Sequence, residues 1–461
     1  MRFRRSPALL WLGALAAAAL HARLFVPGYL LTADDIQSHY QMLTNSFSGV
    51  VELARAAAQG QGRIGHFFVT PINLVASYLA PDIWFRVVAV GAWYGLLLLA
   101  GLWVGRLCRS RSAALLTFLV LATCQRLGFE HMPPNSYPLQ NTIPFVLIFA
   151  ARLLRREGQS PLVRLSLAAV FFLGLIINEF AFVLGLGLVS CEYLAGFSAG
   201  RAEGIARLKS SGLVADAAVL TAALALYLGF RHLHPSGYTG NVPDGWRSID
   251  AVLRTAFFHV LNGTALLNVR PTDFTKASPE ALVISAGLLI VTAAVAWRAL
   301  EHMEMDRPWL LIAVVALLFS FYVTAPVAIV TKYQEWCGDS LKRCAYIDTR
   351  TAFLGLGAAT AALCGWLLRF GRAMRAVLAV SLGVASGTTY LYNLRPLDEM
   401  RLTNEVWTRA DELACASSGA VPDGQALLRA VDPESRVSTH PDFDAVAYWR
   451  VYIDHRRSRC D

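Results

Sequence analysis

The chain has 461 residues, of which 56% are apolar and only 16% are charged, and its formal net charge is +9 at pH 7. Its mean hydropathy of +0.47 lies above that of soluble domains. Its charged fraction lies below theirs, which is about a quarter of the residues. This composition excludes a soluble enzyme, a disordered chain and a nucleic-acid-binding module. The net positive charge does not indicate a polyanion partner, because the basic residues lie at the ends of apolar segments, where they set membrane orientation.

Apolar segments of roughly 17–25 residues recur along the chain, which is the length that a helix needs to cross about 30 Å of hydrocarbon. They predict an all-α polytopic membrane protein with about eleven transmembrane helices, in a range of about ten to twelve. The predicted spans cover residues 7–26, 84–106, 112–127, 141–154, 165–178, 180–197, 213–231, 281–299, 308–328, 351–369 and 376–392.

Arginines at the ends of these segments predict the orientation of the chain. Arg2, Arg4 and Arg5 precede the first span, so the positive-inside rule places the N-terminus in the cytoplasm. With alternating spans the C-terminus is external. The alternative for the first segment is a cleaved signal peptide with residues 17–22 as its cleavage region, and the chain from Leu31 is external in both cases. The predicted inner connections contain Arg106, Arg155, Arg201, Arg298 and Arg369.

Residues 1–392 are predicted to form the transmembrane domain and residues 393–461 a short external segment. Residues 64–82 are amphiphilic, which predicts a helix lying in the outer interface. In the tail, residues 406–413 and 445–452 are expected to form helices that pack on the membrane domain. The predicted outer loops are residues 31–82, 232–280 and 331–350.

Two pairs of cysteines fall in external segments. Cys337 and Cys344 share one outer loop, and Cys415 and Cys460 share the tail, which predicts two disulfides in an oxidising compartment. The alternative is four free thiols. A zinc site is less favoured, because no pair has the short CxxC spacing.

An acidic pair, Asp34-Asp35, lies just beyond the outer end of the first span. Adjacent carboxylates repel each other, so one of them is expected to have a raised pKa, which suits a general base. The alternative is structural: Thr32 caps a helix and the two carboxylates lie in its first turn. His39 follows Asp35 by one helical turn and shares its face.

Further polar residues are predicted at the same outer level. Arg63, in a glycine-bracketed turn, has the geometry to bind a phosphate, although an ordinary surface arginine is the alternative. Asn178 and Glu179 interrupt an apolar run, where a carboxylate faces either a polar cavity or the headgroups. Asp216, near an inner span end, is expected either to pair with an arginine or to extend its carboxylate to the interface. The remaining members are His131, Asn135, Tyr137, Lys332 and Arg350.

In the order of these features the first 200 residues or so resemble the GT-C class of integral-membrane glycosyltransferases, especially bacterial O-antigen glucosyltransferase-like families. The features are the first span, Asp34-Asp35, Gly62-Arg63, the NSYPLQN turn and Asn178-Glu179. The resemblance implies transfer of a sugar, with inversion, from a polyprenyl-phosphate donor to an external glycan or lipid-linked acceptor.

The resemblance also implies roles for these residues. Asp34 or Asp35 would accept the proton of the acceptor hydroxyl, and the second carboxylate would orient the acceptor or hold a divalent cation. The leaving phosphate would be stabilised by cations, with Arg63, Arg350 and Lys332 as candidates. His39, His131, Asn135, Tyr137, Asn178 and Glu179 would contact the substrates.

Arginine outnumbers lysine by about nine to one, which is typical of a GC-rich bacterial source. The expected location is therefore a bacterial inner membrane, with the site on its outer face and undecaprenyl as the carrier lipid.

Two other functions remain open. A transporter or flippase of lipid-linked glycans would need polar residues near the middle of several spans, which are almost wholly apolar here. Another outer-face lipid-linked transferase or ligase would use the polar loop 232–280, with His232, His234, Arg247, Arg254 and His259.

Overall fold

The structure is a computed structural model that describes residues 7–128, 132–156, 158–199, 211–237, 249–304, 306–339, 344–416, 421–437 and 444–460. These ranges form helices and loops, with an isolated β-bridge between Gln125 and Thr264. The prediction of an all-α chain is confirmed for the described residues.

A helix forms within each predicted apolar run. In the described part of the chain, six of these helices, α5, α11, α14, α15, α17 and α18, are long and apolar enough to cross a membrane. The number of crossings and their orientation stay predictions, since α6 and α7 have 13 residues each. The bounds are α1 Pro7–Ala22, α5 Ile83–Leu107, α6 Arg111–Thr123, α7 Thr142–Leu154, α8 Pro161–Ile177, α9 Glu179–Ala199, α11 Ser211–Leu233, α14 Pro279–Glu301, α15 Trp309–Ala328, α17 Ile347–Leu367 and α18 Arg372–Cys415.

Large apolar side chains cover the outside of this helical body. Val88, Val214 and Val283 are 67%, 70% and 72% exposed, although each belongs to a long apolar helix. Apolar surface of this extent is unfavourable in water and favourable against lipid. The apolar helices therefore indicate an integral membrane protein.

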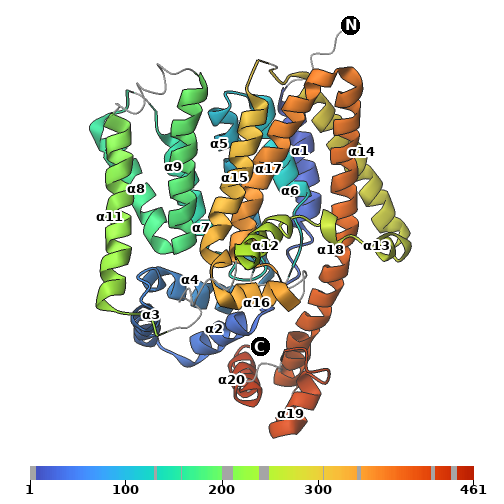
Figure 1. Ribbon diagram of the computed structural model, residues 1–461. Coiled ribbons are helices and arrows are strands. Elements are labelled where there is room, and N and C mark those ends of the chain that lie inside the picture. The colour runs from blue at the N-terminus through green and yellow to red at the C-terminus, as the bar shows by residue number, and fades with distance from the viewer. Residues whose placement is uncertain are drawn as a thin grey trace.

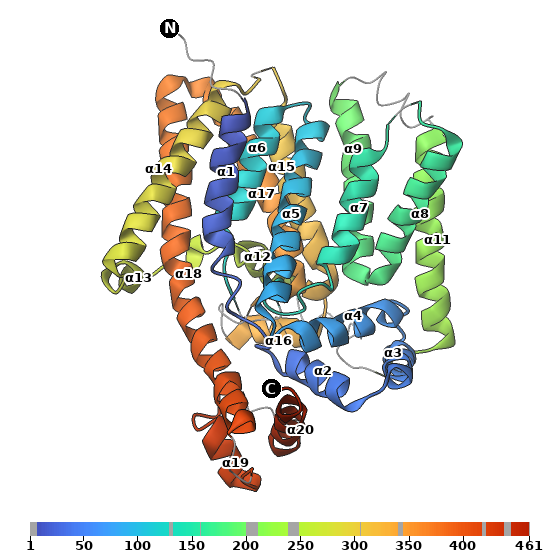
Figure 2. The ribbon, with the colours of Figure 1, turned by 180° about the vertical axis from the view of Figure 1, so that it is seen from behind.

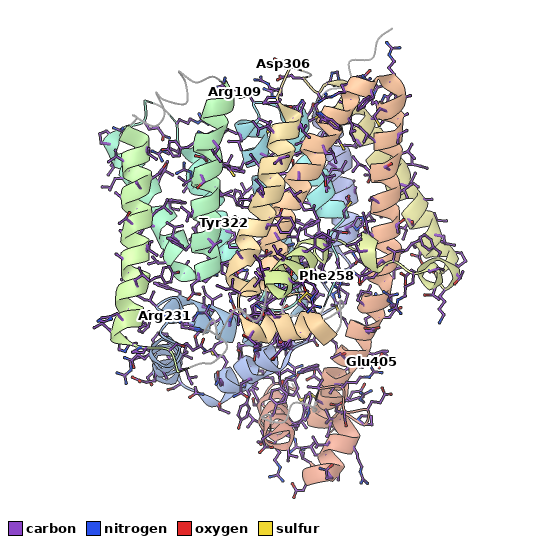
Figure 3. All side chains as sticks on the ribbon, in the orientation of Figure 1. Arg109, Arg231, Phe258, Asp306, Tyr322 and Glu405 are labelled. Atoms are coloured by element: carbon purple, nitrogen blue, oxygen red, sulfur yellow. A yellow bond between two sulfur atoms is a disulfide. The ribbon has the colours of Figure 1, made fainter. Side chains whose placement is uncertain are left out.

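The helices named above run side by side, and most of the remaining helices lie toward one end of this body (Figures 1 and 2). α1 begins at the opposite end, where Arg109 and Asp306 also lie, whereas Arg231 and Glu405 lie toward the end with the short helices (Figure 3). The short helices are α2 Ala33–Thr44, α3 Phe47–Gln61, α4 His66–Leu79, α12 Ile249–Leu261, α13 Pro271–Thr275, α16 Thr331–Asp339, α19 Gly424–Val431 and α20 Ala445–Arg457.

A second hydrophobic core, the tail core, joins the tail to α2. Ile36 of α2 packs with Trp407 of α18 and with Tyr448 and Trp449 of α20, apart from the larger core of the helical body. α18 has 44 residues, which corresponds to about 66 Å and exceeds the hydrocarbon thickness. The boundary predicted at 392/393 therefore lies within one continuous helix, because α18 belongs to both cores.

One cluster of charged residues inside the helical body is held together by ion pairs. Arg152 of α7 donates to Asp216 of α11 at 2.8 Å and also forms an ion pair with Glu192 of α9. Arg155 donates to Asp216 at 2.5 Å. This agrees with the expected pairing of Asp216 and ties three helices together.

Candidate functional site

The two adjacent aspartates have different environments. Thr32 caps α2, and Asp35 completes the capping box by accepting from the Thr32 backbone N–H. Asp35 is 3% exposed and also accepts from the Thr32 and Ser136 hydroxyls, at 2.7 and 2.8 Å, and from the backbone N–H of Tyr137 at 3.2 Å. Asp35 therefore fastens α2 to the loop before α7, as the capping alternative predicts. Asp34, by contrast, is exposed.

Tyr137 connects that loop to the exposed carboxylate. Its hydroxyl donates to Asp34 Oδ2. Burial first, and then the charge of Asp34, raises the pKa of Tyr137 well above its usual value, so the phenol keeps its proton. The backbone of Tyr137 has a φ of 48°, which is uncommon for a non-glycine residue and costs of order 1 kcal/mol. Such strain is tolerated where the surrounding contacts hold a side chain in place.

Arg63 and Glu179 form a bidentate ion pair. Arg63 Nε donates to Glu179 Oε1 at 2.7 Å, and Nη2 donates to Oε2. The two side chains are 25% and 38% exposed, so the pair lies at the surface of the body. Among the described residues, Nη1 of Arg63 has no hydrogen-bond partner. One edge of a fixed guanidinium therefore remains for another anion.

Two glycines bring this pair together. Gly62 ends α3 with a φ of 62°, and a Cβ there would lie 2.4 Å from the carbonyl oxygen of His234. A Cβ on Gly65 would lie 2.6 Å from the carbonyl oxygen of Ile177. Only glycine permits these approaches. The approach of Gly62 sets the turn carrying Arg63 against the segment after α11, and that of Gly65 sets it against the junction of α8 and α9.

Tyr346 lies near both the Asp34–Tyr137 contact and the Arg63–Glu179 pair. It lies within electrostatic range of both Arg63 and Tyr137, and its ring is 4.8 Å from that of Tyr333, a second neighbour of Arg63. The structure thus brings Asp34, Tyr137, Arg63 and Glu179 into one region at the short-helix end. Tyr333 and Tyr346 were not among the predicted site residues. The only signal in the sequence is that Tyr333 follows Lys332 and that Tyr346 lies two residues after Cys344.

Other predicted members hold the backbone in place. Arg350 is 1% exposed and donates to the carbonyl oxygens of Arg126 and Pro133 at 2.5 and 2.9 Å, and this burial argues against a phosphate-binding role. Asn135 donates to the carbonyl oxygens of Phe25 and Gly28.

Asn178 belongs to the same structural group. It caps the first turn of α9 by accepting from the N–H of Ala181 at 2.7 Å, and it donates to the backbone of Gln140. Asn178 therefore positions Glu179.

His39 faces the tail instead of the site. Its Nδ1 lies 2.8 Å from the Tyr448 hydroxyl, which accepts from Trp407. Burial, and then the charge of His455, lowers the pKa of His39 to about 3. His39 is thus a neutral residue of the tail core, and its burial argues against a role in substrate binding. His131 lies outside the described residues.

The remaining predicted cation and cysteines are located as follows. Lys332, at the start of α16, lies 4.9 Å from the Trp336 ring centre and precedes Tyr333. Cys337–Cys344 and Cys415–Cys460 are both disulfides. Among the described residues, the group that could hold a metal ion includes Cys337 and Cys344 and neither aspartate of the acidic pair.

An apolar cavity lies within the helical body. Its volume is about 320 Å³, and its walls come from α5, α9, α15 and α17, including Trp103, Leu188, Ile312, Phe319 and Leu354. It contains none of the predicted site residues.

Comparison of the chain with protein-family models, with curated proteins and with solved structures gave no match. The function is therefore inferred from the residues themselves.

Proposed function

We propose that the protein is a membrane glycosyltransferase that transfers a sugar from a polyprenyl-phosphate donor to an external glycan or lipid-linked acceptor. The observation that carries the proposal is the environment of Asp34, an exposed carboxylate that accepts from a buried, protonated tyrosine. Asp35, whose two oxygens accept backbone and hydroxyl hydrogen bonds, is assigned to structure.

In the proposed reaction, Asp34 accepts the proton of the acceptor hydroxyl while that oxygen forms a bond to the anomeric carbon. The bond from this carbon to the donor phosphate breaks, and its electron pair leaves with the polyprenyl phosphate. Attack opposite the leaving group inverts the anomeric centre. A positioned base of this kind contributes about 10²–10⁴-fold to a rate.

Arg63 is proposed to stabilise the phosphate, because Glu179 fixes the guanidinium and leaves Nη1 for a phosphate oxygen. Lys332 is a second candidate cation. The apolar body supports a lipid-linked donor. We propose an outer-face location in a bacterial inner membrane. The positive-inside rule supports the outer face, since the short-helix end is opposite the start of α1 (Figure 1).

The test is replacement of Asp34 by Asn. Membranes containing this variant are expected to transfer at least about 100-fold less sugar from a panel of radiolabelled undecaprenyl-phosphate sugars to endogenous acceptors. The matched control is Glu52→Gln, since Glu52 is another exposed carboxylate near this end, with a side-chain exposure of 63%. Unchanged transfer by Asp34→Asn would contradict the proposal.

A further inference from the structure

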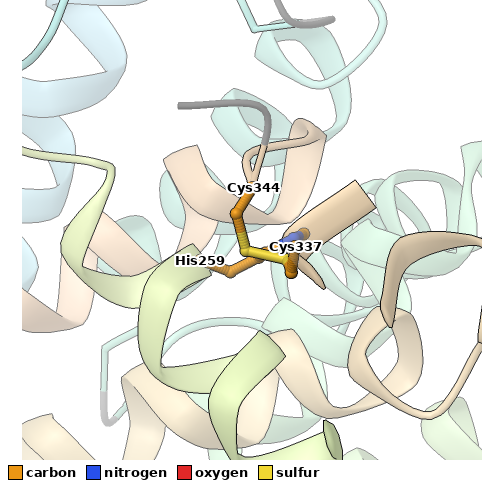
Figure 4. A group of neighbouring side chains, drawn as sticks. All are labelled: His259, Cys337 and Cys344. Atoms are coloured by element: carbon orange, nitrogen blue, oxygen red, sulfur yellow. A yellow bond between two sulfur atoms is a disulfide. The ribbon is translucent and has the colours of Figure 1, made fainter. Parts of the chain in front are cut away.

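A second group of reactive side chains lies apart from the acidic pair. His259 of α12, Cys337 of α16 and Cys344, just before α17, have potential ligand atoms that all lie within 4.8 Å of one another (Figure 4). All three residues are buried. His259 and the nearer cysteine are 78 positions apart in the sequence, and the packing of α12 against α16 and α17 brings them together.

The histidine is oriented by a carboxylate. His259 Nδ1 lies 2.9 and 2.8 Å from the two oxygens of Asp348, which is fully buried. With Nδ1–H donating to Asp348, Nε2 carries the lone pair. This is the carboxylate–histidine arrangement found behind metal ions, in which the carboxylate fixes the tautomer and raises the basicity of the ring.

We propose that the dithiol form of Cys337 and Cys344 binds Zn²⁺ together with the imidazole of His259, and that Asp348 is the positioning residue. Two thiolates and an imidazole are ligands that zinc prefers, and water would complete the tetrahedron. Tetrahedral bond lengths require about 3.8 Å between the sulfurs and about 3.6 Å from each sulfur to the nitrogen. Reduction of the disulfide allows the two sulfurs to move apart toward this spacing.

The electrons and protons balance with an external dithiol as the reductant. Its two thiols pass two electrons and two protons to the Cys337–Cys344 disulfide and become a disulfide themselves. Zinc then displaces the two thiol protons as the metal–sulfur bonds form. Oxidation and metal binding exclude each other, because both use the same sulfur atoms.

The other disulfide provides a matched comparison. Cys415–Cys460 joins the end of α18 to the segment after α20, and among the described residues it belongs to no such group of ligands. Reduction of this pair is therefore expected to create no zinc site.

The experiment uses the full chain in detergent, with Cys415 and Cys460 replaced by Ser so that one disulfide remains. After reduction with a phosphine and its removal under anaerobic conditions, Co²⁺ is titrated as the probe. We expect one Co²⁺ per chain, a thiolate-to-cobalt charge-transfer absorption, and displacement of Co²⁺ by Zn²⁺. The unreduced protein is expected to give no such absorption.

Variants identify the ligands. In the same background, Cys337→Ser with Cys344→Ser is expected to abolish the absorption, and Asp348→Asn to weaken binding by about 10–100-fold. Size-exclusion profiles and helical circular dichroism check folding. Failure of the reduced parent to bind Co²⁺, or equal absorption from the double-serine variant, would overturn the proposal. Neither readout depends on glycosyl transfer.

Discussion

Two groups of charged residues, one toward each end of the helical body, differ in how far they are exposed. Near the end where α1 begins, Arg152 lies between Glu192 and Asp216, and the Arg152 and Asp216 side chains are each 5% exposed. At the end with the short helices, the Arg63–Glu179 pair is 25% and 38% exposed, and Asp34 is at the surface.

The difference in exposure distinguishes charges that stabilise the fold from charges that a substrate can reach. A buried ion pair must be fully compensated, because either partner alone would be a costly charge in a medium of low dielectric constant. A partly exposed pair tolerates the loss of a partner and can exchange it for a ligand. The Arg63–Glu179 pair and Asp34 therefore combine charge and exposure at the end of a lipid-facing body.

The largest loss of stability is expected at the end where α1 begins, because the ion pairs there are buried. Replacing Arg152 by Ala leaves Glu192 and Asp216 without their shared cation and should destabilise the fold by about 3–5 kcal/mol. Thermal unfolding in detergent and the yield of monodisperse protein measure it. Arg155→Ala is the control: Arg155 is 29% exposed, so a smaller loss is expected, and equal losses would contradict the comparison.

At the short-helix end, Arg63 and Glu179 are expected to contribute unequally to binding of the donor. Arg63→Gln removes the proposed phosphate ligand, and loss of a charge-assisted hydrogen bond of about 1.5–3 kcal/mol raises the KM for the donor by about 10–100-fold. Glu179→Gln leaves the cation in place and should change this KM much less. Equal changes in KM would indicate that the pair acts only as a structural contact.

The tail core should weaken in acid. His39 has a pKa of about 3 when folded and about 6.5 when unfolded, so the unfolded state binds the proton first as the pH falls. Its stabilisation is complete above pH 6.5 and decreases toward pH 3, by about 2 kcal/mol at pH 5. The measurement is thermal unfolding between pH 5 and 8, and His39→Gln should flatten the slope. An unchanged slope would refute the buried, neutral histidine.

The smallest effect distinguishes the adjacent aspartates. Asp35→Asn weakens the capping box and the bonds from Ser136 and Tyr137, which should cost about 1–2 kcal/mol of stability. Asp34→Asn should leave the unfolding midpoint nearly unchanged, because its side chain is exposed. Comparing the two midpoints in one detergent tests this, and a larger loss for Asp34→Asn would reverse the assignment.

The helices were predictable because helix formation is local. An apolar run of roughly 17–25 residues satisfies its own backbone hydrogen bonds, so the sequence alone located each helix in the body. The cap at Thr32 is also local, since Asp35 lies within the same turn. The extent of α18 was not predictable, because its polar second half is stabilised by packing against α20 and α2.

The sequence by itself determined that the chain is a helical membrane protein with scarce charge and an acidic pair after the first span. The tertiary structure decided which carboxylate is buried, because the donors to Asp35 come from Ser136 and Tyr137, about a hundred residues away. It also paired Arg63 with Glu179 and brought His259 to the Cys337–Cys344 disulfide. Contacts between distant segments depend on how helices pack, and spacing along the chain carries no record of that packing.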